Sequence, residues 1–379
     1  MKVMDELLAP ADTLLNPDIE EWKKAGGKTI GYFCTAYVPE ELISAAGMLP
    51  FRMRATGSTG TEKGDKYAHS TTCSFVRHTF DMALRENYSF LDGLVAPNSC
   101  DHIRRMFDAW RRGKMPTPTS PYYLHLFIVP FKYGDGAYDY LRREIVKFQK
   151  SLEDHFQVKI TKEALQKAIK EANETRRLLK ELYQLRKKEN PPITGEQAHR
   201  IVLASTAMPR DKYNKLLKDL LTDLQGKAGV NGYSARLMLV GGVLDDSDYI
   251  KLIEDQGGLV VTDFLCYGTR HFEDLVDEYM EPIEALTKRY LERLSCPRMM
   301  DHARRFEYIK NKVQEFKVDG IVCHRLMFCD NWGGESWMLR QDTKEAGIPF
   351  LGVEREYRLG AVEQLRTRIQ AFLETVGRR

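Results

Sequence analysis

Seven cysteines are the residues of this sequence whose type is best suited to chemistry. They are Cys34, Cys73, Cys100, Cys266, Cys296, Cys323 and Cys329. Their odd number, and an acidic N-terminal segment without the basic-then-apolar pattern of an export signal, argue against a disulfide framework. In a reducing compartment, scattered cysteines are either small buried apolar residues or thiolate ligands of a metal or cluster. Both interpretations stay open for any one cysteine taken alone.

The spacing of the cysteines bears on which kind of metal site they could form. Cys73 and Cys100 are 27 positions apart, and Cys266 and Cys296 are 30 apart. Structural zinc sites usually have ligand pairs separated by two to four residues, and ferredoxin runs are equally compact. Single cysteines far apart in sequence, each at the end of a strand or the start of a helix, can instead assemble an iron–sulfur cluster between two domains.

Short apolar runs alternate with helix-like segments in the first and last thirds of the chain. Strands are expected at 29–33, 48–54, 91–96, 122–129, 237–240, 259–262, 320–325 and 349–353. Because these runs do not alternate in polarity, they indicate parallel sheets covered on both faces. Long helices fill the middle of the chain. The sequence therefore predicts an α/β fold with two parallel-sheet, flavodoxin- or Rossmann-like domains, at 1–135 and 227–379, joined by a helical connector at 136–226.

Four cysteines follow expected strands directly or within a few residues. They are Cys34, Cys100, Cys266 and Cys329. Ligands of open parallel sheets bind beyond the carboxyl ends of the strands, so these four are placed at the functional edge.

The other three cysteines have different settings. Cys73 opens an expected helix, whose dipole should lower the pKa of the thiol. Cys296 lies in a loop between two helices that can reach the cleft between the domains. Cys323 lies inside an apolar strand and is expected to be a core residue.

The composition excludes several classes of function. The 57 basic and 54 acidic residues give a net charge of +3, which is not the basic excess of a nucleic-acid-binding protein. No apolar run approaches the length of a membrane-spanning helix, so a cytoplasmic protein is expected. No P-loop or dinucleotide fingerprint is present, so no nucleotide site is expected in this chain.

Three motifs resemble one known superfamily. They are GYFCTAYVPEELI at 31–43 followed by AAGMLP at 45–50, SCD at 99–101 followed by Arg104 and Arg105, and FCD at 328–330. Together they resemble the 2-hydroxyacyl-CoA dehydratase/benzoyl-CoA reductase superfamily over nearly the whole chain. That resemblance implies two α/β domains with an iron–sulfur cluster in the cleft between them. It also implies electron supply from a separate dimeric ATPase that carries its own [4Fe-4S] cluster.

The resemblance also assigns cluster ligands. Dehydratase subunits of the superfamily hold one [4Fe-4S] cluster with three cysteines, which correspond to Cys73, Cys100 and Cys329. Cys266 and Cys296 resemble additional cysteines of the double-cubane proteins, whose [8Fe-9S] cluster shares one sulfide between two cubanes and needs six thiolates. Cys34 is taken as the sixth ligand in preference to Cys323, because Cys34 is expected at the sheet edge.

Two further residues are candidates for catalysis. Glu40 begins an expected helix, where it either supports the helix start or donates a proton beside the cluster. His324 lies near the end of the strand that leads to Cys329. It either donates a proton or hydrogen bond to the cluster or substrate, or it is a core histidine whose hydrogen bonds are satisfied.

Three functions are compared. The first is a homodimeric double-cubane reductase that receives low-potential electrons from the ATPase partner and reduces small molecules. The alternative is a subunit of a heterodimeric 2-hydroxyacyl-CoA dehydratase or benzoyl-CoA reductase, which acts on an acyl-CoA thioester with one [4Fe-4S] cluster. The third is a non-catalytic scaffold or cluster-assembly protein. About eight irons per chain would favour the first, and about four the second.

Overall fold

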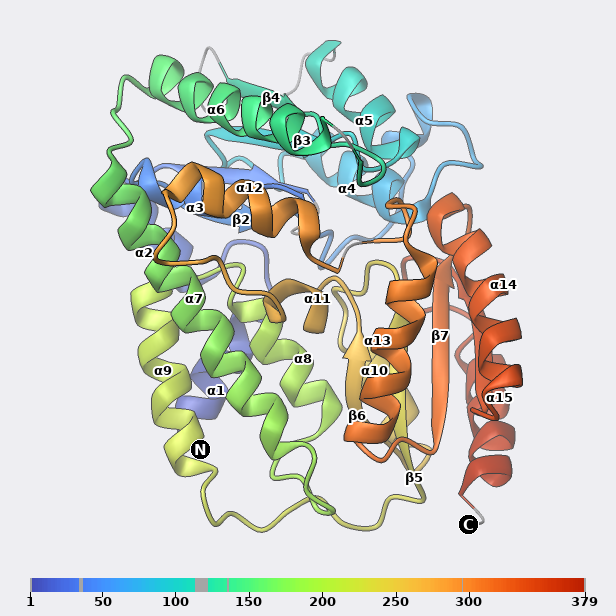
Figure 1. Ribbon diagram of the computed structural model, residues 1–379. Helices are drawn as coiled ribbons and strands as arrows, with labels where there is room; N and C mark the ends of the chain where they lie inside the picture. Colours follow the sequence, from blue (N-terminus) through green and yellow to red (C-terminus); the bar gives the residue numbers. More distant parts are fainter. Residues whose placement is uncertain (1, 34–36, 113–121, 135, 295, 378–379) are drawn as a thin grey trace.

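Two parallel four-stranded sheets form the framework of the protein (Figure 1). The computed structural model describes residues 2–33, 37–112, 122–134, 136–294 and 296–377. The first sheet has the order β2-β1-β3-β4, and the second has the order β6-β5-β7-β8. The strands are β1 (Thr29–Tyr32), β2 (Leu49–Arg52), β3 (Gly93–Pro97), β4 (Tyr123–Phe127), β5 (Ala235–Gly241), β6 (Gly258–Phe264), β7 (Gly320–Leu326) and β8 (Phe350–Arg355). Both sheets thus share the order 2-1-3-4, which begins the flavodoxin-like arrangement, and the predicted α/β class is confirmed.

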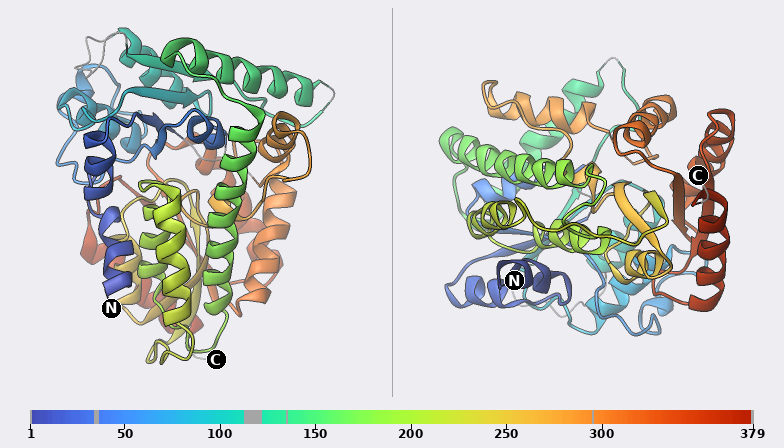
Figure 2. Two further views of the ribbon diagram at one scale, coloured as in Figure 1. Left: turned by 90° about the vertical axis from the view of Figure 1, so that its left-hand side faces the viewer. Right: turned by 90° about the horizontal axis from the view of Figure 1, so that it is seen from below.

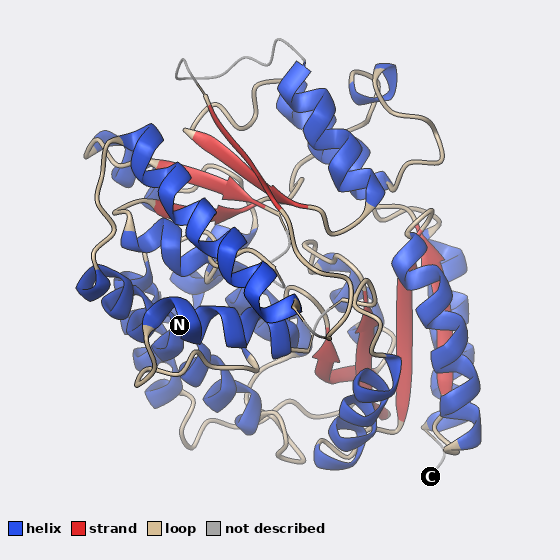
Figure 3. Ribbon diagram, turned by 45° about the horizontal axis from the view of Figure 1, so that its top comes forward, coloured by secondary structure: helices blue, strands red, loops and turns tan. Residues whose placement is uncertain are grey.

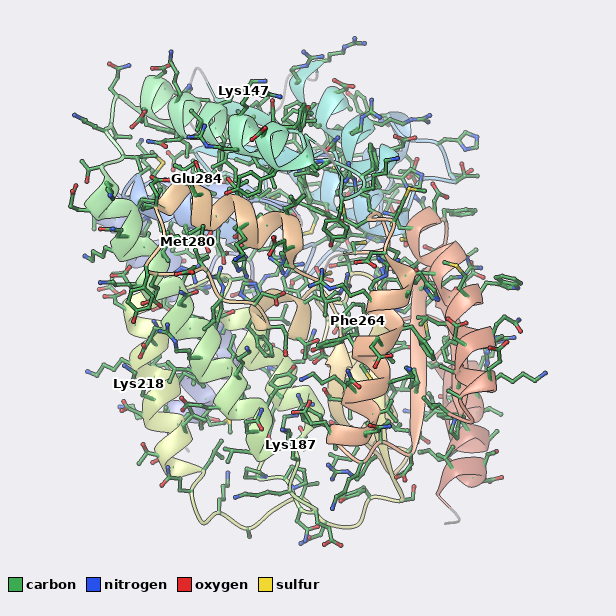
Figure 4. All side chains as sticks on the ribbon, in the orientation of Figure 1. Lys147, Lys187, Lys218, Phe264, Met280 and Glu284 are labelled. Atoms are coloured by element: carbon green, nitrogen blue, oxygen red, sulfur yellow. The ribbon has the colours of Figure 1, made fainter. Side chains whose placement is uncertain are left out.

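Helices cover both faces of the first sheet. α3 (Glu40–Ala45) and α6 (Ala137–Phe156) pack on one face, and α4 (Ser74–Leu84) and α5 (Asp101–Arg112) pack on the other. α12 (Pro282–Glu292), from the last third of the chain, lies beside α6 over the first sheet (Figure 1). Glu284 of α12, labelled in Figure 4, accepts a hydrogen bond from the Tyr138 hydroxyl of α6 at 2.7 Å. Segments far apart in sequence therefore build one layer.

The second sheet is also covered on both faces. α10 (Asp248–Glu254) and α15 (Val362–Val376) pack on one side, with Leu237 and Leu239 of β5. α13 (His302–Glu315) and α14 (Asp330–Glu345) pack on the other side, with Met238 and Val240. Because alternate residues of β5 point to opposite covered faces, all of them are apolar or buried. This double coverage explains the continuous apolar runs in the sequence.

The helices that follow the first sheet in the sequence, together with the N-terminal helix, complete the core. α7 (Lys162–Leu185), α8 (Gly195–Ala204) and α9 (Arg210–Asp223) form a bundle with α1 (Lys2–Leu8) and pack against β6. Figure 2 shows this bundle from the side and from below. The structure also contains α2 (Pro17–Lys24) and the short α11 (Thr269–Phe272), which the sequence did not indicate. Figure 3 shows the two sheets as separate groups of strands running in different directions.

Candidate functional site

The carboxyl ends of the two sheets meet in the middle of the molecule. The Tyr267 hydroxyl, beyond β6, donates to the Met53 carbonyl, beyond β2, at 2.9 Å. The backbone N–H of Ala55 donates to Asp245 Oδ2, beyond β5, at 3.1 Å. Because ligands of open parallel sheets bind at this edge, a group shared by the two halves of the chain would lie at this junction.

Three cysteines stand at helix starts beside the junction. Cys73 is the N-cap of α4, Cys100 directly precedes α5, and Cys329 is the N-cap of α14. Cys100 Sγ accepts the Ile103 N–H at 3.4 Å. The first turn of a helix presents unpaired N–H groups and a partial positive charge, which favour a thiolate or another anion. Three helix starts therefore direct favourable dipoles toward sulfur.

The thiols from the two halves gather around Cys329. The pKa of Cys329 is raised well above its usual value, first by burial and then by the neighbouring thiols of Cys73, Cys296 and Cys100. Cys73 and Cys100 precede helices of the first sheet, whereas Cys296 and Cys329 come from the second half of the chain. Four thiolates in this space would repel one another, and cations bound among them would remove the repulsion.

Burial, more than the helix dipole, sets the protonation of Cys73. Burial raises the pKa of Cys73 to about 11, while hydrogen bonds from the backbone N–H groups of Phe75 and Val76 act in the opposite direction. The sequence predicted a lowered pKa at this helix start. That prediction is wrong for the metal-free chain, because desolvation outweighs the dipole. The thiol keeps its proton at neutral pH, so a metal ion that bound here would have to displace that proton.

Positive side chains accompany the thiols. Arg355 lowers the pKa of Cys73 against the larger effect of burial. The pKa of Arg305 is raised against burial, mainly by Glu335 and in smaller part by Cys296. Soft sulfur donors with guanidinium groups nearby suit an anionic, thiolate-bound iron–sulfur cluster. Within the described ranges, no three His, Cys, Asp or Glu side chains are grouped as ligands of a single metal ion.

The three remaining cysteines, Cys266, Cys323 and Cys34, differ from one another in position. Cys266 lies beyond β6, half-buried, with its thiol directed at the Gly242 carbonyl at 3.6 Å. Val243 and Cys266 pack against the same small core group, which contains Ala11, Leu203 and Tyr267. Cys323 is 1% exposed inside β7, in a core with its pKa raised to about 12 by burial. Cys34 lies outside the described residues.

Glu40 is part of a buried ion network. It accepts a hydrogen bond from the Tyr32 hydroxyl and forms ion pairs with Arg210 at 2.9 Å and Arg176 at 3.6 Å. Burial alone would raise the pKa of Glu40, but Arg210, His271 and Arg176 together hold it well below its usual value. The carboxylate is therefore ionised at neutral pH and carries no proton to donate.

His324 is fully buried at the end of β7. Its Nδ1 accepts from Arg355 Nε at 3.3 Å, and its ring lies 5.5 Å from that of Tyr249. Burial and the positive charge of Arg355 lower the pKa of His324 well below its usual value. The ring is neutral, so it can donate a hydrogen bond from Nε2 but not an acidic proton.

Comparison with known proteins identifies the family. Residues 35–376 match the family described as 2-hydroxyglutaryl-CoA dehydratase, D-component. The chain belongs to this family. It is 26% identical to the (R)-phenyllactyl-CoA dehydratase beta subunit of Clostridium sporogenes, over 96% of this chain and 97% of that protein. It is 28% identical to a benzoyl-CoA reductase subunit of Thauera aromatica, over 94% and 93%, and 25% identical to the putative dehydratase subunit YjiM of Escherichia coli strain K12, over 94% and 93%. The predicted 2-hydroxyacyl-CoA dehydratase/benzoyl-CoA reductase superfamily is confirmed.

Buried arginines are the part of the site that sequence reasoning missed. Arg52 donates to the Cys266 carbonyl at 2.6 Å. Arg298, two residues after Cys296, donates to the carbonyls of Asn98, Val129 and Pro130 at 2.9, 2.9 and 2.6 Å. These partners lie some 170 to 215 positions away in sequence, and no local motif marks them. The arginines therefore hold the cysteine loops through hydrogen bonds to backbone carbonyls.

No helix among the described residues is both long enough and apolar enough to cross a membrane.

Proposed function

We propose that this chain is a subunit of an enzyme of the 2-hydroxyacyl-CoA dehydratase or benzoyl-CoA reductase type, acting on an acyl-CoA thioester. The single observation that carries the proposal is the gathering of the Cys73, Cys100 and Cys296 thiols around Cys329. The named activities of the relatives support the CoA thioester as the substrate class. They favour this interpretation over a reductase of other small molecules.

Cys73, Cys100 and Cys329 would hold a [4Fe-4S] cluster. Such a cluster supplies single-electron transfer when it is bound. The chain contributes three ligands on rigid helix starts, which fixes the spacing of the sulfurs. It also shields Cys73 from water, since that residue is 7% exposed, whereas Cys100 and Cys329 are half-buried. The guanidinium groups of Arg305 and Arg355 lie near the sulfurs and offset negative charge there.

Electron supply would come from a separate protein. The chain has no P-loop, and added negative charge makes a thiolate-bound cluster difficult to reduce. We therefore propose a dimeric ATPase with its own [4Fe-4S] cluster as the donor. Turnover that needed only dithionite, without a partner or ATP, would contradict this part of the proposal.

One observation favours a second candidate, the [8Fe-9S] double cubane of a homodimeric small-molecule reductase. Cys296 is a fourth thiol beside Cys329, and Cys266 follows β6, where its carbonyl accepts a hydrogen bond from Arg52 of β2. With Cys34 these would make six thiolates. If the chain holds a single cubane, Cys296 and Cys266 need no metal.

Iron and sulfide per chain, measured after anaerobic purification, test both candidates. About four irons are expected for the dehydratase or reductase subunit, and about eight for the double cubane. Cys73→Ser, Cys100→Ser and Cys329→Ser should each strip or convert the cluster in either case. Cys34→Ser, Cys266→Ser and Cys296→Ser should remove about half of the iron only if a second cubane exists.

Cys323→Ser is the matched control for these variants, because Cys323 is buried in β7 within an apolar core. It should lower stability modestly and keep all of the iron. Full iron content in the Cys73, Cys100 and Cys329 variants would refute the cluster assignment.

A further inference from the structure

A group of buried hydrogen-bond donors without partners lies at the carboxyl end of β5. Arg270 Nε and Nη1, His324 Nε2 and Trp332 Nε1 are all buried and have no hydrogen-bond partner. Arg270, His324 and Trp332 are 3%, 0% and 1% exposed. We call these three residues the β5 donor cluster. Unpartnered buried donors are rare in folded proteins, and each one calls for an explanation.

The three side chains surround the same two glycines. Arg270 Nη2 donates to the Gly241 carbonyl at 2.8 Å. A Cβ on Gly241 would stand 2.5 Å from His324 Nε2, and a Cβ on Gly242 would stand 3.5 Å from Trp332 Nε1. Arg270 Cζ is 5.3 Å from the centre of the Trp332 ring. The donors therefore belong to one small region, which glycine keeps open to side chains from β7, α11 and α14.

The three nitrogens act as donors. Arginine and the indole of tryptophan have no acceptor atom. His324 Nδ1 accepts from Arg355 Nε at 3.3 Å, so the neutral ring carries its hydrogen on Nε2. A group that binds here must supply acceptors only.

Arg270 also lacks a compensating negative charge. No carboxylate forms an ion pair with it in the part of the chain that the structure describes. Asp263, seven positions earlier, directs its carboxylate to the Tyr183 hydroxyl and to the N–H groups of Leu265 and Thr269. The guanidinium instead lies over the rings of Phe264 and Trp332. Phe264 is labelled in Figure 4, at the end of β6 beside α13. A buried cation of this kind needs an anion rather than water alone.

We propose that the β5 donor cluster is a binding site for an acceptor-only anion. Two sources fit this chemistry. One is a small planar oxyanion, such as the carboxylate of a small molecule. The other is the anionic edge of a cluster that extends toward Cys266, whose thiol points to the Gly242 carbonyl at 3.6 Å. The second source rests on the proposed function, whereas the first does not.

Iron-free protein tests the first source. Thermal unfolding is measured in sodium formate and in sodium chloride at equal ionic strength. Formate at roughly ten times its Kd should raise the melting temperature by about 2 °C. Arg270→Met should abolish this rise, and Trp332→Phe, which keeps the ring but removes one donor, should weaken it.

Arg236→Met is the matched control. Arg236 lies at the opposite end of β5, and its guanidinium donates to the carbonyls of Phe316, Lys188, Glu189 and Arg186. Because these contacts need no ligand, the variant should lower the melting temperature in both salts and keep the formate response. Arg270→Met should lower it less, since it removes a buried charge that has no counterion.

Iron-loaded protein tests the second source. There Arg270→Met should shift the midpoint potential of the cluster to a more negative value, since it removes a nearby positive charge, and Arg236→Met should not. A formate response alone assigns a small oxyanion, and a potential shift alone assigns the cluster edge. An equal formate response in wild type and Arg270→Met, or the absence of both effects, would overturn the proposal. If Arg270→Met does not fold, the same comparisons are made with Trp332→Phe.

Discussion

Two opposing effects determine the pKa of the Cys73 thiol. Its position at the start of α4 favours the thiolate, but burial favours the neutral thiol and sets the pKa at about 11. A thiol in this state is a weak nucleophile at neutral pH, and a metal ion that bound it would have to displace its proton.

The raised pKa of Cys73 predicts how the stability of the iron-free chain depends on pH. The unfolded thiol loses its proton near pH 9, while the folded thiol holds it to about pH 11. The folded state binds the proton more tightly, so its stability is complete below pH 9 and falls as the pH rises toward 11, by on the order of 2–3 kcal/mol. Urea unfolding at pH 8 and pH 10.5 measures the loss. Cys73→Ser should show a smaller loss, and an identical pH dependence in both proteins would contradict the assignment.

The ion network around Glu40 predicts that this residue contributes to the stability of the fold. Its carboxylate forms a buried ion pair with Arg210, and Glu40→Gln removes the negative charge from that pair. Breaking a buried ion pair typically costs about 3–5 kcal/mol. We expect the free energy of unfolding, measured by urea titration, to fall by an amount in this range. Glu20→Gln, on an exposed position, is the control. Unchanged stability would contradict the role of Glu40 in the ion network.

The sequence could predict the residues that follow strands, but not the arginines that hold them. The placement of Cys100, Cys266 and Cys329 follows from strand ends that an apolar run reveals. The contacts of Arg298 and Arg270 depend on carbonyls and rings brought together only by the complete fold. Ionisable residues are usually exposed, so their burial here carries no local signal.

At the scale of the elements, α14 shows where local propensity misleads. Gly333 and Gly334 are poor helix formers, so local propensity alone disfavours a helix before Glu335. The helix nevertheless begins at Asp330. Trp332, 1% exposed, packs in the core with Cys323 and Leu339, and this tertiary burial offsets the weak propensity of the glycines. The early start is what makes Cys329 an N-cap.

The same glycines give an element-scale prediction. A Cβ on Gly334 meets nothing within 4 Å, so Gly334→Ala should extend good helix propensity through the first turns of α14 and raise stability by about 0.5–1 kcal/mol. Gly241→Ala in β5 is the contrasting variant, because its Cβ would clash with the His324 backbone oxygen. It should destabilise the protein. Chemical denaturation measures the change in the free energy of unfolding for both variants. Equal changes would contradict the packing described around Gly241 and Gly334.

For the whole molecule, the important contacts run between the segments that follow the strands of different sheets. Tyr357, beyond β8, receives the Ala55 N–H at 3.1 Å and donates its hydroxyl to Asp245 at 2.7 Å. Its own N–H donates to Ser74 Oγ, next to Cys73, at 2.9 Å. One buried tyrosine therefore ties the ends of both sheets to the start of α4.

Removing that hydroxyl should loosen the junction. Tyr357→Phe leaves buried polar atoms of Asp245 and Ala55 with fewer partners, so we expect a loss of about 1–3 kcal/mol in the free energy of unfolding. Tyr67→Phe, at a side chain 59% exposed, should change stability by less than about 0.5 kcal/mol. Hydrogen exchange of β1 and β5 amides shows whether the junction opens. No difference between the two variants would mean that the hydroxyl does not join the sheets.

The arginine contacts around the cysteine loops have a consequence for how the finished protein is made. Arg298 closes the loop of Cys296 onto the carbonyls of Asn98, Val129 and Pro130 with hydrogen bonds that belong to the polypeptide alone. The loop of Cys296 is thus tied by the polypeptide itself to the segments that follow β3 and β4. A cluster of the proposed kind would therefore enter a site in which the fold has already fixed this loop.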